Sequence, residues 1–272
     1  MKQGSKQLGK AFLGLALGLV WLIPFYLMVT NSFKTKQEIF TNPLKFPEAF
    51  TFENYPEAFR QLDFIRTLAN SLLITVSSVI VIVIFSAMAA YALERIKSKF
   101  STITFMVFVA AMLVPFQSVM IPLVALFGKA QMLNQIGIIF MYLGFGGSMS
   151  IFLYHGAMKS IPRALDEAAI IDGASRWQVF WKVIFPMLKP TTVTVAALNT
   201  MWIWNDYLLP SLVINSPTTQ TIPLKMFFFF GQYTKQWHLA LAGLVIAILP
   251  VIIFYFFMQK QIIKGVADGA VK

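Results

Sequence analysis

Residues 67–93 read TLANSLLITVSSVIVIVIFSAMAAYAL, a run without any Asp, Glu, Lys or Arg. A helix of about 20 apolar residues spans the hydrocarbon core of a bilayer, because each residue adds about 1.5 Å of rise. An uncharged run of this length is longer than the helices that usually fill the core of a soluble domain. It therefore predicts a transmembrane helix, and the rest of the chain has to fit that fold class.

Five further apolar runs flank this one. The six predicted spans cover residues 11–30, 67–93, 102–127, 135–158, 183–214 and 239–258. The chain is 58% hydrophobic and only 12% charged, whereas soluble domains carry about 25% charged residues. We expect an all-α membrane protein with six transmembrane helices, in which residues 1–272 form a single transmembrane domain embedded in the lipid bilayer.

The basic residues between the runs predict the orientation of the chain. In a soluble protein a net charge of +11 would suggest nucleic-acid binding, but here the cations lie in the loops. If both termini are cytoplasmic, most of the 22 lysines and arginines fall on the inner side, as the positive-inside rule requires. We therefore expect a multi-pass protein with both termini in the cytoplasm and no nucleic-acid partner.

Several kinds of catalytic site are missing from the sequence. The Gly-Lys pairs at 9–10 and 128–129 lack the upstream glycine and the following Ser or Thr of a phosphate-binding loop. His155 and His238 fall near opposite sides of the membrane and cannot share a metal ion, and the chain has no cysteine. We expect a transporter component and not an enzyme.

Residues 160–190, between the fourth and fifth predicted spans, have the pattern of two helices joined by a turn. Ser160 can cap the first helix, and Pro162 suits its first turn. Gly173 stands where a left-handed C-terminal cap belongs, and Ser175 can cap the second helix. The predicted orientation places this loop in the cytoplasm.

The first helix of the loop is short and amphipathic. Leu165, Ala168, Ala169 and Asp172 recur at helical spacing on one side. The two alanines leave a low surface that another protein could approach closely. A short rigid helix of this kind is suited to transferring force from a partner to the spans.

The loop also carries a specific motif. Glu167-Ala168-Ala169 is followed by three residues and Gly173, then by nine residues and Val183-Ile184-Phe185-Pro186. This sequence resembles the E-A-A-x3-G-x9-I-x-L-P motif of the membrane subunits of bacterial ATP-binding-cassette (ABC) importers. Apolar Val183 and Phe185 replace the usual Ile and Leu.

In the family that this motif resembles, the loop docks into a groove on a cytoplasmic ATPase subunit. The resemblance implies that Glu167 is the polar anchor and that Gly173 makes the turn. It also implies that Ala168 and Ala169 form the contact surface, with Asp172 on the same side. Two separate ABC ATPase subunits would then bind ATP and Mg, and this chain itself would hold no cofactor and no metal.

Other segments narrow the resemblance to carbohydrate importers of the maltose-permease type, and within them to MalG-like subunits. They include Asn42-Pro43, residues 52–55 (Phe-Glu-Asn-Tyr) and residues 204–207 (Trp-Asn-Asp-Tyr). Such a subunit pairs with a second homologous permease subunit in the bacterial inner or plasma membrane. It receives its sugar from an extracytoplasmic sugar-binding protein. The implied fold is that of a type I ABC importer permease.

Polar side chains at membrane depth are costly and are therefore candidates for function. Asn199, Trp202 and Asp206 follow at i, i+3 and i+7, and Asn205 is adjacent. Amide and carboxylate groups can bond to sugar hydroxyls, and an indole can stack on a sugar ring. Gln117 lies between two prolines that weaken a helix, a feature tolerated where helices line a cavity. These residues predict a substrate pathway, although packing between helices explains the same pattern.

Two other classes of transporter remain open at this point. An ABC importer permease could carry a solute other than a sugar. An ion-coupled secondary transporter would need coupling carboxylates within the spans, where Asp206 is the acidic residue that lies well inside one.

Overall fold

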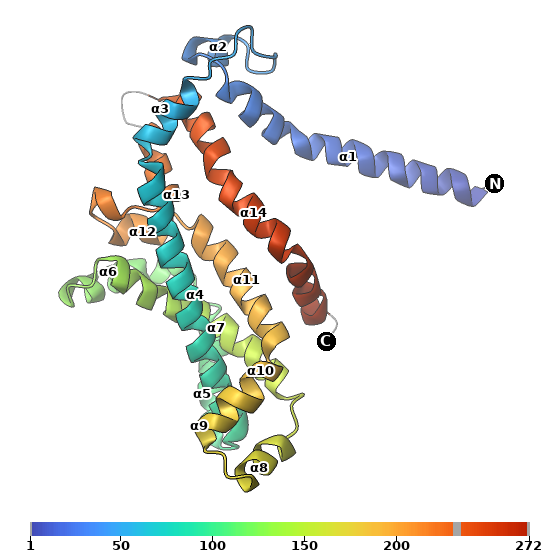
Figure 1. Cartoon of the computed structure of the whole chain (residues 1–272), viewed down its shortest axis with the longest axis vertical. Coiled ribbons are helices and arrows are strands. Elements are labelled where there is room, and N and C mark those ends of the chain that lie inside the picture. The colour runs from blue at the N-terminus through green and yellow to red at the C-terminus, as the bar shows by residue number, and fades with distance from the viewer. Residues whose placement is uncertain (1, 231–234, 271–272) are drawn as a thin grey trace. The chain divides into compact units, whose positions relative to one another are not determined.

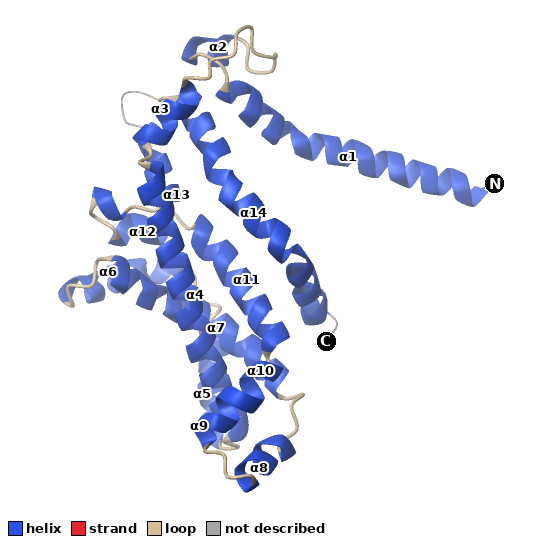
Figure 2. Cartoon of the chain, viewed as in Figure 1, coloured by secondary structure: helices blue, strands red, loops and turns tan. Residues whose placement is uncertain are grey.

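The computed structural model describes residues 2–230 and 235–270, and it leaves out the side chains of 2–10, 257–258 and 260–270. Helices dominate this part of the chain, as Figure 2 shows. Extended pairing within it is limited to an isolated antiparallel bridge between Phe230 and Lys235. The prediction of an all-α fold is confirmed.

The elements follow one another along the chain as labelled in Figure 1. They are α1 (Lys2–Ser32), α2 (Lys36–Thr41), α3 (Asn54–Gln61), α4 (Phe64–Arg95), α5 (Lys99–Ala111), α6 (Phe116–Lys129), α7 (Gln135–Met158), α8 (Ala164–Ile171), α9 (Arg176–Gln178), the π-helix η1 (Val179–Ile184), α10 (Phe185–Met187), α11 (Lys189–Asn205), α12 (Leu208–Val213), the 3-10 helix η2 (Pro217–Thr219), α13 (Ile222–Met226), the 3-10 helix η3 (Phe227–Phe229) and α14 (Trp237–Ala270).

Among the described residues, four helical segments are long and apolar enough to cross a membrane. They are Ala11–Ser32, Phe64–Arg95, Gln135–Met158 and Trp237–Phe256. These segments match four of the six predicted spans. The structure thus supports a membrane protein with four such helices, or five if the bent pair α5 and α6 crosses as one.

The other two predicted spans are broken helices. α5 and α6 run in different directions (Figure 1), and their axes differ by 106°. Pro115 stands in an extended conformation as the N-cap of α6. Proline disfavours helical geometry in the residue before it, so the helix breaks directly before Pro115. In the fifth predicted span, Pro186 and Pro190 each open a new helix, and α11 has only 17 residues.

The fold divides into two compact units. One comprises Met1–Phe64 and Lys225–Ile253, and the other comprises Ile65–Leu224 and Phe254–Lys272. We refer to them as unit 1 and unit 2. The residues predicted to have functional roles all fall in unit 2.

A buried lysine organises the loop after α1 in unit 1. The Lys34 side chain is fully buried, and its Nζ donates to Asn31 Oδ1 at 3.0 Å and to the carbonyls of Asn42 at 2.8 Å and Lys45 at 2.6 Å. Asn54 Nδ2 donates to the Lys34 carbonyl at 2.9 Å. These bonds replace the water that the ammonium group loses on burial, and they fix residues 35–53 against the end of α1.

In unit 2, α7 contacts several other helices, and two of them approach it closely at Gly146. A Cβ atom at Gly146 would lie 2.7 Å from Ile82 Cδ1 of α4 and would overlap Asn199 Oδ1 of α11. Ser86 Oγ of α4 donates to the Gly147 carbonyl at 3.5 Å, and Asn199 Nδ2 donates to Ser150 Oγ at 3.0 Å. Small residues at helix contacts are typical of packing within membranes.

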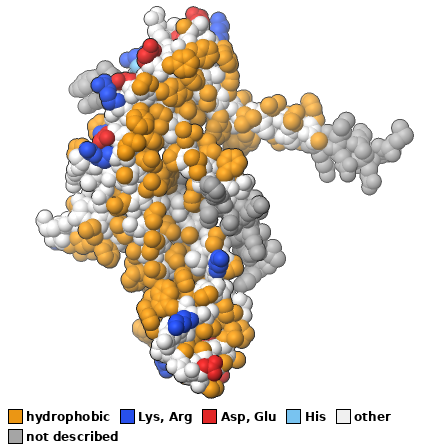
Figure 3. All heavy atoms as spheres, in the orientation of Figure 1, with side chains coloured by type: hydrophobic (Ala, Val, Ile, Leu, Met, Phe, Trp, Pro, Cys, Tyr) orange, Lys and Arg blue, Asp and Glu red, His pale blue; other side chains and the backbone are white. Residues whose placement is uncertain are grey.

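Outside these contacts, many large apolar side chains are exposed. On α1, Phe12 is 74% exposed and Trp21 is 76% exposed. Figure 3 shows hydrophobic side chains over most of the face in view, with few charged side chains among them. A water-soluble chain does not tolerate such a surface, whereas lipid or a partner subunit can cover it.

The contact at Gly146 yields a testable prediction. We expect Gly146→Ala to destabilise the protein by about 1–3 kcal/mol, because the added methyl group forces α4 and α11 away from α7. Gly144→Ala is the matched control, since a Cβ at that helical position meets no atom within 4 Å. Thermal unfolding of the two purified variants in detergent would show the difference. Equal unfolding temperatures would contradict this description of the packing.

Candidate functional site

The first helix of the 160–190 loop begins later than the sequence predicts. α8 starts at Ala164 and has no side-chain cap, so the prediction that Ser160 caps it is wrong. Ser160 Oγ instead donates to the Ala157 carbonyl at 2.7 Å, at the end of α7. The residue before Pro162 is pushed out of the helical region, and the helix therefore starts only after the proline.

The turn between the two helices follows the sequence prediction. Gly173 has a φ of +88°, a value that side-chain-bearing residues rarely adopt. The Ala174 amide donates to the Ala169 carbonyl at 2.9 Å and closes the end of α8. Ser175 and Gln178 then form a reciprocal capping box at the start of α9. The predicted roles of Gly173 and Ser175 in the turn are confirmed.

One side of this loop is open to the surroundings. Glu167, Ala168, Asp172 and Gly173 are exposed, while Ala169 is half-buried against the core. A shallow hollow of about 360 Å³ lies between α8 and the following helices. It is lined by Ala169, Asp172, Gly173, Ala174, Gln178, Lys182 and Val183. All five residues predicted to couple to an ATPase therefore lie on the exposed side or at its edge.

The loop also exposes large apolar residues that the sequence prediction left out. Ile171 is 85% exposed, and Trp177 is 59% exposed. Ile170 and Ile171 follow the Glu-Ala-Ala triplet directly. The apolar pair at the end of an amphipathic helix was the available signal for these contacts. Exposed apolar side chains beside a hollow are the usual features of a protein-binding surface.

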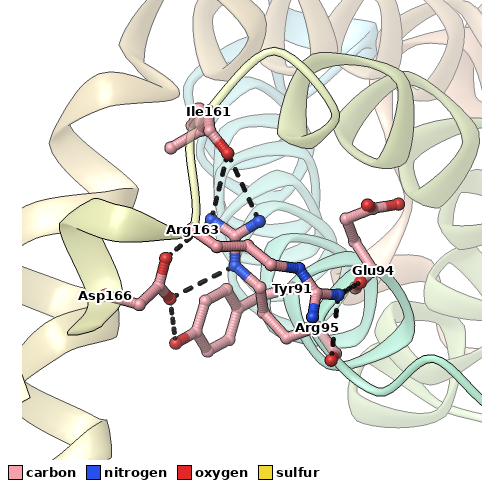
Figure 4. Close-up of polar contacts among 6 residues, drawn as sticks. All are labelled: Tyr91, Glu94, Arg95, Ile161, Arg163 and Asp166. Atoms are coloured by element: carbon pink, nitrogen blue, oxygen red, sulfur yellow. Dashed lines mark hydrogen bonds and ion pairs between the residues drawn. The ribbon is translucent and has the colours of Figure 1, made fainter.

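The opposite side of α8 is anchored to α4, as Figure 4 shows. The buried Asp166 carboxylate receives Arg95 Nη2 at 2.7 Å and Nε at 3.2 Å, together with the Tyr91 hydroxyl at 2.7 Å. Arg163 Nη2 donates to the carbonyls of Glu94 at 2.7 Å and Arg95 at 3.1 Å. Asp166 precedes Glu167 in the sequence and faces the other side of the helix. This second acidic residue was the feature of the sequence that could have indicated the anchor.

A second contact lies beside the anchor at the end of α7. His155 Nε2 is 3.3 Å from Glu94 Oε2, and its ring stacks on Phe105 with 4.0 Å between ring centroids. Among the described residues, no group of three His, Cys, Asp or Glu side chains could hold a metal ion. These charged and aromatic groups tie the end of α4 and the end of α7 to α5.

Three of the five predicted pathway residues contact α7. Asn199 is buried, and its Nδ2 donates to Ser150 Oγ at 3.0 Å and to the Val195 carbonyl at 2.9 Å. Trp202 is 43% exposed and meets the Tyr142 ring edge-on, with ring centroids 5.3 Å apart. This is the shared face that the i, i+3 and i+7 spacing predicts, and Asn199 is fully engaged in packing on it.

Asp206 marks the break between α11 and α12. Its Oδ2 accepts from the Tyr142 hydroxyl at 2.9 Å, and its Oδ1 accepts from the amides of Leu208 at 2.9 Å and Leu209 at 3.4 Å. The carboxylate thus satisfies the first amides of α12, which have no partner within the helix. Asp206 is therefore held by three donors, one of which, the Tyr142 hydroxyl, belongs to α7.

The last two pathway residues are exposed. Gln117 lies in the first turn of α6, directly after the bend at Pro115. Asn205 Nδ2 donates to the Met201 carbonyl at 2.7 Å within α11, and its side chain remains exposed. Both therefore present amide groups outside the packed contacts of α7.

Comparison with known proteins shows several relatives of this chain. The probable starch degradation products transport system permease protein AmyC of Thermoanaerobacterium thermosulfurigenes is 57% identical over 261 residues, covering 96% of this chain and 95% of that protein. The multiple sugar-binding transport system permease protein MsmG of Streptococcus mutans is 37% identical, covering 94% and 93%. The melibiose/raffinose/stachyose import permease protein MelC of Bacillus subtilis is 34% identical, covering 92% and 91%.

Solved structures show the same fold. A chain of a bacterial ABC transporter involved in the import of the acidic polysaccharide alginate matches with a TM-score of 0.76 at 24% identity, covering 94% of this chain and 97% of that one. A chain of the bacterial alginate ABC transporter in complex with an alginate pentasaccharide-bound periplasmic protein matches with a TM-score of 0.68 at 16% identity, covering 92% and 93%.

A family match agrees with these relatives. The family is described as the inner membrane component of binding-protein-dependent transport systems, and it matches residues 82–268. The matched part contains the motif loop, the anchor on Asp166 and the α7–α11 contact. It makes up more than half of the chain, and the chain therefore belongs to the family of binding-protein-dependent transport system inner membrane components.

Proposed function

We propose that this chain is the membrane-spanning permease subunit of an ABC importer that takes up a sugar or an oligosaccharide. The observation that carries the proposal is the likeness, over nearly the whole chain, to permeases named for starch degradation products, for multiple sugars and for melibiose, raffinose and stachyose. Family membership removes the ion-coupled secondary transporter as an alternative. It also makes the chain a transport component rather than an enzyme.

The 160–190 loop is the proposed docking site for the ATPase. Its exposed side offers Glu167 for polar contact, the low surface of Ala168 and the apolar side chain of Ile171. Gly173 and Asp172 line the hollow into which a partner side chain can fit. Two ABC ATPase subunits would bind ATP and Mg and supply hydrolysis, because this chain carries no phosphate-binding loop.

Two more partners complete the proposed importer. A second homologous permease subunit supplies the other half of the translocation pathway and the second docking loop. An extracytoplasmic binding protein delivers the sugar. The described complex of an alginate transporter with its periplasmic protein supports this arrangement, since that transporter shares the fold.

In this proposal the chain lies in the bacterial inner or plasma membrane with both termini cytoplasmic. Residues 1–272 act as one permease domain with six spans, of which α5–α6 and the broken 183–214 region are the irregular ones. The distribution of lysine and arginine supports this orientation, because it places the 160–190 loop on the cytoplasmic side.

Exposed polar groups near the helix breaks are the proposed substrate pathway. Trp202 offers the face of its indole, and Asn205 and Gln117 offer amide groups for sugar hydroxyls. Asp206 and Asn199 belong to the same proposed pathway, where their bonds to α7 hold the contact groups in place. Breaks in membrane helices commonly line such cavities.

The docking proposal predicts the effect of Glu167→Ala. We expect at least tenfold less sugar uptake in proteoliposomes and weaker co-purification of the ATPase subunits, because a charge-assisted contact is lost. Insertion into the membrane should be unchanged. Glu57→Ala is the matched control, since Glu57 is paired on the surface with Arg60 in unit 1. Normal uptake by the Glu167 variant would remove the residue from the docking surface.

The orientation gives a second prediction. Because the chain contains no cysteine, Ala168→Cys introduces one unique thiol on the exposed side of α8. We expect a membrane-impermeant maleimide to label it in inside-out vesicles and not in intact spheroplasts. Residue 168 should lose its label when the ATPase subunits are bound. Labelling from the outside would refute both the topology and the docking site.

The pathway gives a third prediction. Trp202→Ala should alter the ranking of transported oligosaccharides or lower the uptake rate by up to about tenfold, because loss of a stacking aromatic costs about 0.5–1.5 kcal/mol. Subunit assembly should persist. Competition among sugars of different length in the uptake assay measures the effect. Unchanged rate and selectivity would assign Trp202 to packing against Tyr142 alone.

A further inference from the structure

The two ends of α4 hold two segments that are far apart in the sequence. α4 runs without interruption from Phe64 to Arg95 and carries no proline. Asn70 lies near its start and Arg95 at its end, 25 residues apart, which corresponds to about 37 Å along a helix. This distance exceeds the roughly 30 Å hydrocarbon thickness of a bilayer. One rigid element therefore connects the two sides of the proposed membrane.

The end of α4 at Arg95 holds the docking helix. The Arg95–Asp166 ion pair has side-chain exposures of 13% and 11%, so water screens it little. The guanidinium contacts both carboxylate oxygens, and it also donates to the Ile161 carbonyl at 3.3 Å. In the opposite direction, Arg163 beside α8 donates to the last two carbonyls of α4 (Figure 4). Two-point contacts of this kind fix orientation as well as distance.

The end of α4 at Asn70 holds the segment after α12. Asn70 Nδ2 donates to the carbonyls of Thr218 at 2.9 Å and Gln220 at 3.0 Å. Its Oδ1 accepts from Gln135 Nε2 at 3.1 Å, at the start of α7. The neighbouring Ser71 Oγ accepts from the Ile222 amide at 2.9 Å. Residues 217–222 thus take their position from the first turns of α4.

The middle of α4 is packed and not free to bend. Ile82, Ala87 and Ala90 are fully buried, and Gly146 of α7 leaves no room for an extra methyl group beside Ile82. A continuous helix with a buried face moves as a unit, since bending it would break its backbone ladder without an alternative partner in lipid.

We propose that α4 transmits displacement of α8 to residues 217–222, with Arg95 and Asn70 as the positioning residues at its two ends. The inference rests on the proposed function, which makes α8 the ATPase contact. Neither residue touches the sugar or the ATPase. Their role is to hold both α8 and residues 217–222 on α4, so that the two segments move together and ATP hydrolysis produces transport.

A double-mutant cycle tests this proposal on the complete importer in proteoliposomes. The variants are Arg95→Gln, Asn70→Leu and their combination, with Arg60→Gln as the control because Arg60 is 78% exposed in a surface pair. The measured quantity is sugar transported per ATP hydrolysed, in preparations whose subunits co-purify normally. We expect each single variant to lower this ratio at least fivefold, and the combination to lower it no further.

The possible outcomes separate the two proposals. Multiplication of the two effects in the combined variant would overturn transmission through α4, because independent sites add in free energy. An unchanged ratio in either single variant would overturn it as well. Failure of the unmodified chain to transport sugar with its ATPase would overturn the proposed function itself. The Arg60 control should match the unmodified chain.

A cross-linking experiment distinguishes loss of the α4–α8 connection from poor folding of the variants. Tyr91→Cys combined with Asp166→Cys removes the anchor in a chain that has no other cysteine. A short bis-methanethiosulfonate forms one mixed disulfide with each cysteine and releases sulfinate. With cysteine-free partner subunits it should then restore transport per ATP, and a reductant that cleaves these disulfides should abolish it again. An efficiently cross-linked importer that stays uncoupled would refute the proposal.

Discussion

The fold depends on the close approach of three helices at Gly146. Ile82 of α4 and Asn199 of α11 both lie where a side chain at this position would be. Lipid offers no hydrophobic gain for bringing helices together, so tight van der Waals contact and interhelical bonds have to supply the association. The bonds from Asn199 to Ser150 and from Ser86 to the Gly147 carbonyl lie within one turn of this glycine. Contacts with α7 therefore determine the positions of α4 and α11.

This placement gives the 160–190 loop its two contrasting sides. One side of α8 is fixed to α4 through Asp166, and the other side leaves Glu167 and Ile171 uncovered. Because a buried ion pair fixes α8 to α4, a force on the exposed side of α8 would act on α4 and would not simply rotate α8 about its connecting segments. The broken helices of the fifth predicted span, with Asp206 bridging α11 and α12, provide irregular backbone near the exposed amides. Rigid and irregular parts thus occur in the same unit, each where the proposed function needs it.

Local features of this protein could be predicted from sequence, and long-range ones could not. Gly173 and Ser175 act on backbone within a few residues of themselves, so their types and spacing sufficed. Four spans were equally evident from length and lack of charge. The Arg95–Asp166 anchor joins residues 71 positions apart, and nothing in either neighbourhood specifies the partner. The bend of 106° at Pro115 was foreseen only as a weakened helix, because proline fixes the place of a break and not its angle.

The exposed Ile171 and Trp177 have a consequence for the life of the chain before assembly. In the proposed orientation, an unassembled subunit would present these large apolar side chains to the cytoplasm, where chaperones and proteases survey such surfaces. A cell that makes this subunit in excess would therefore clear the surplus. The abundance of the importer would then follow the scarcest subunit, and the surface that joins the subunits would also regulate their stoichiometry.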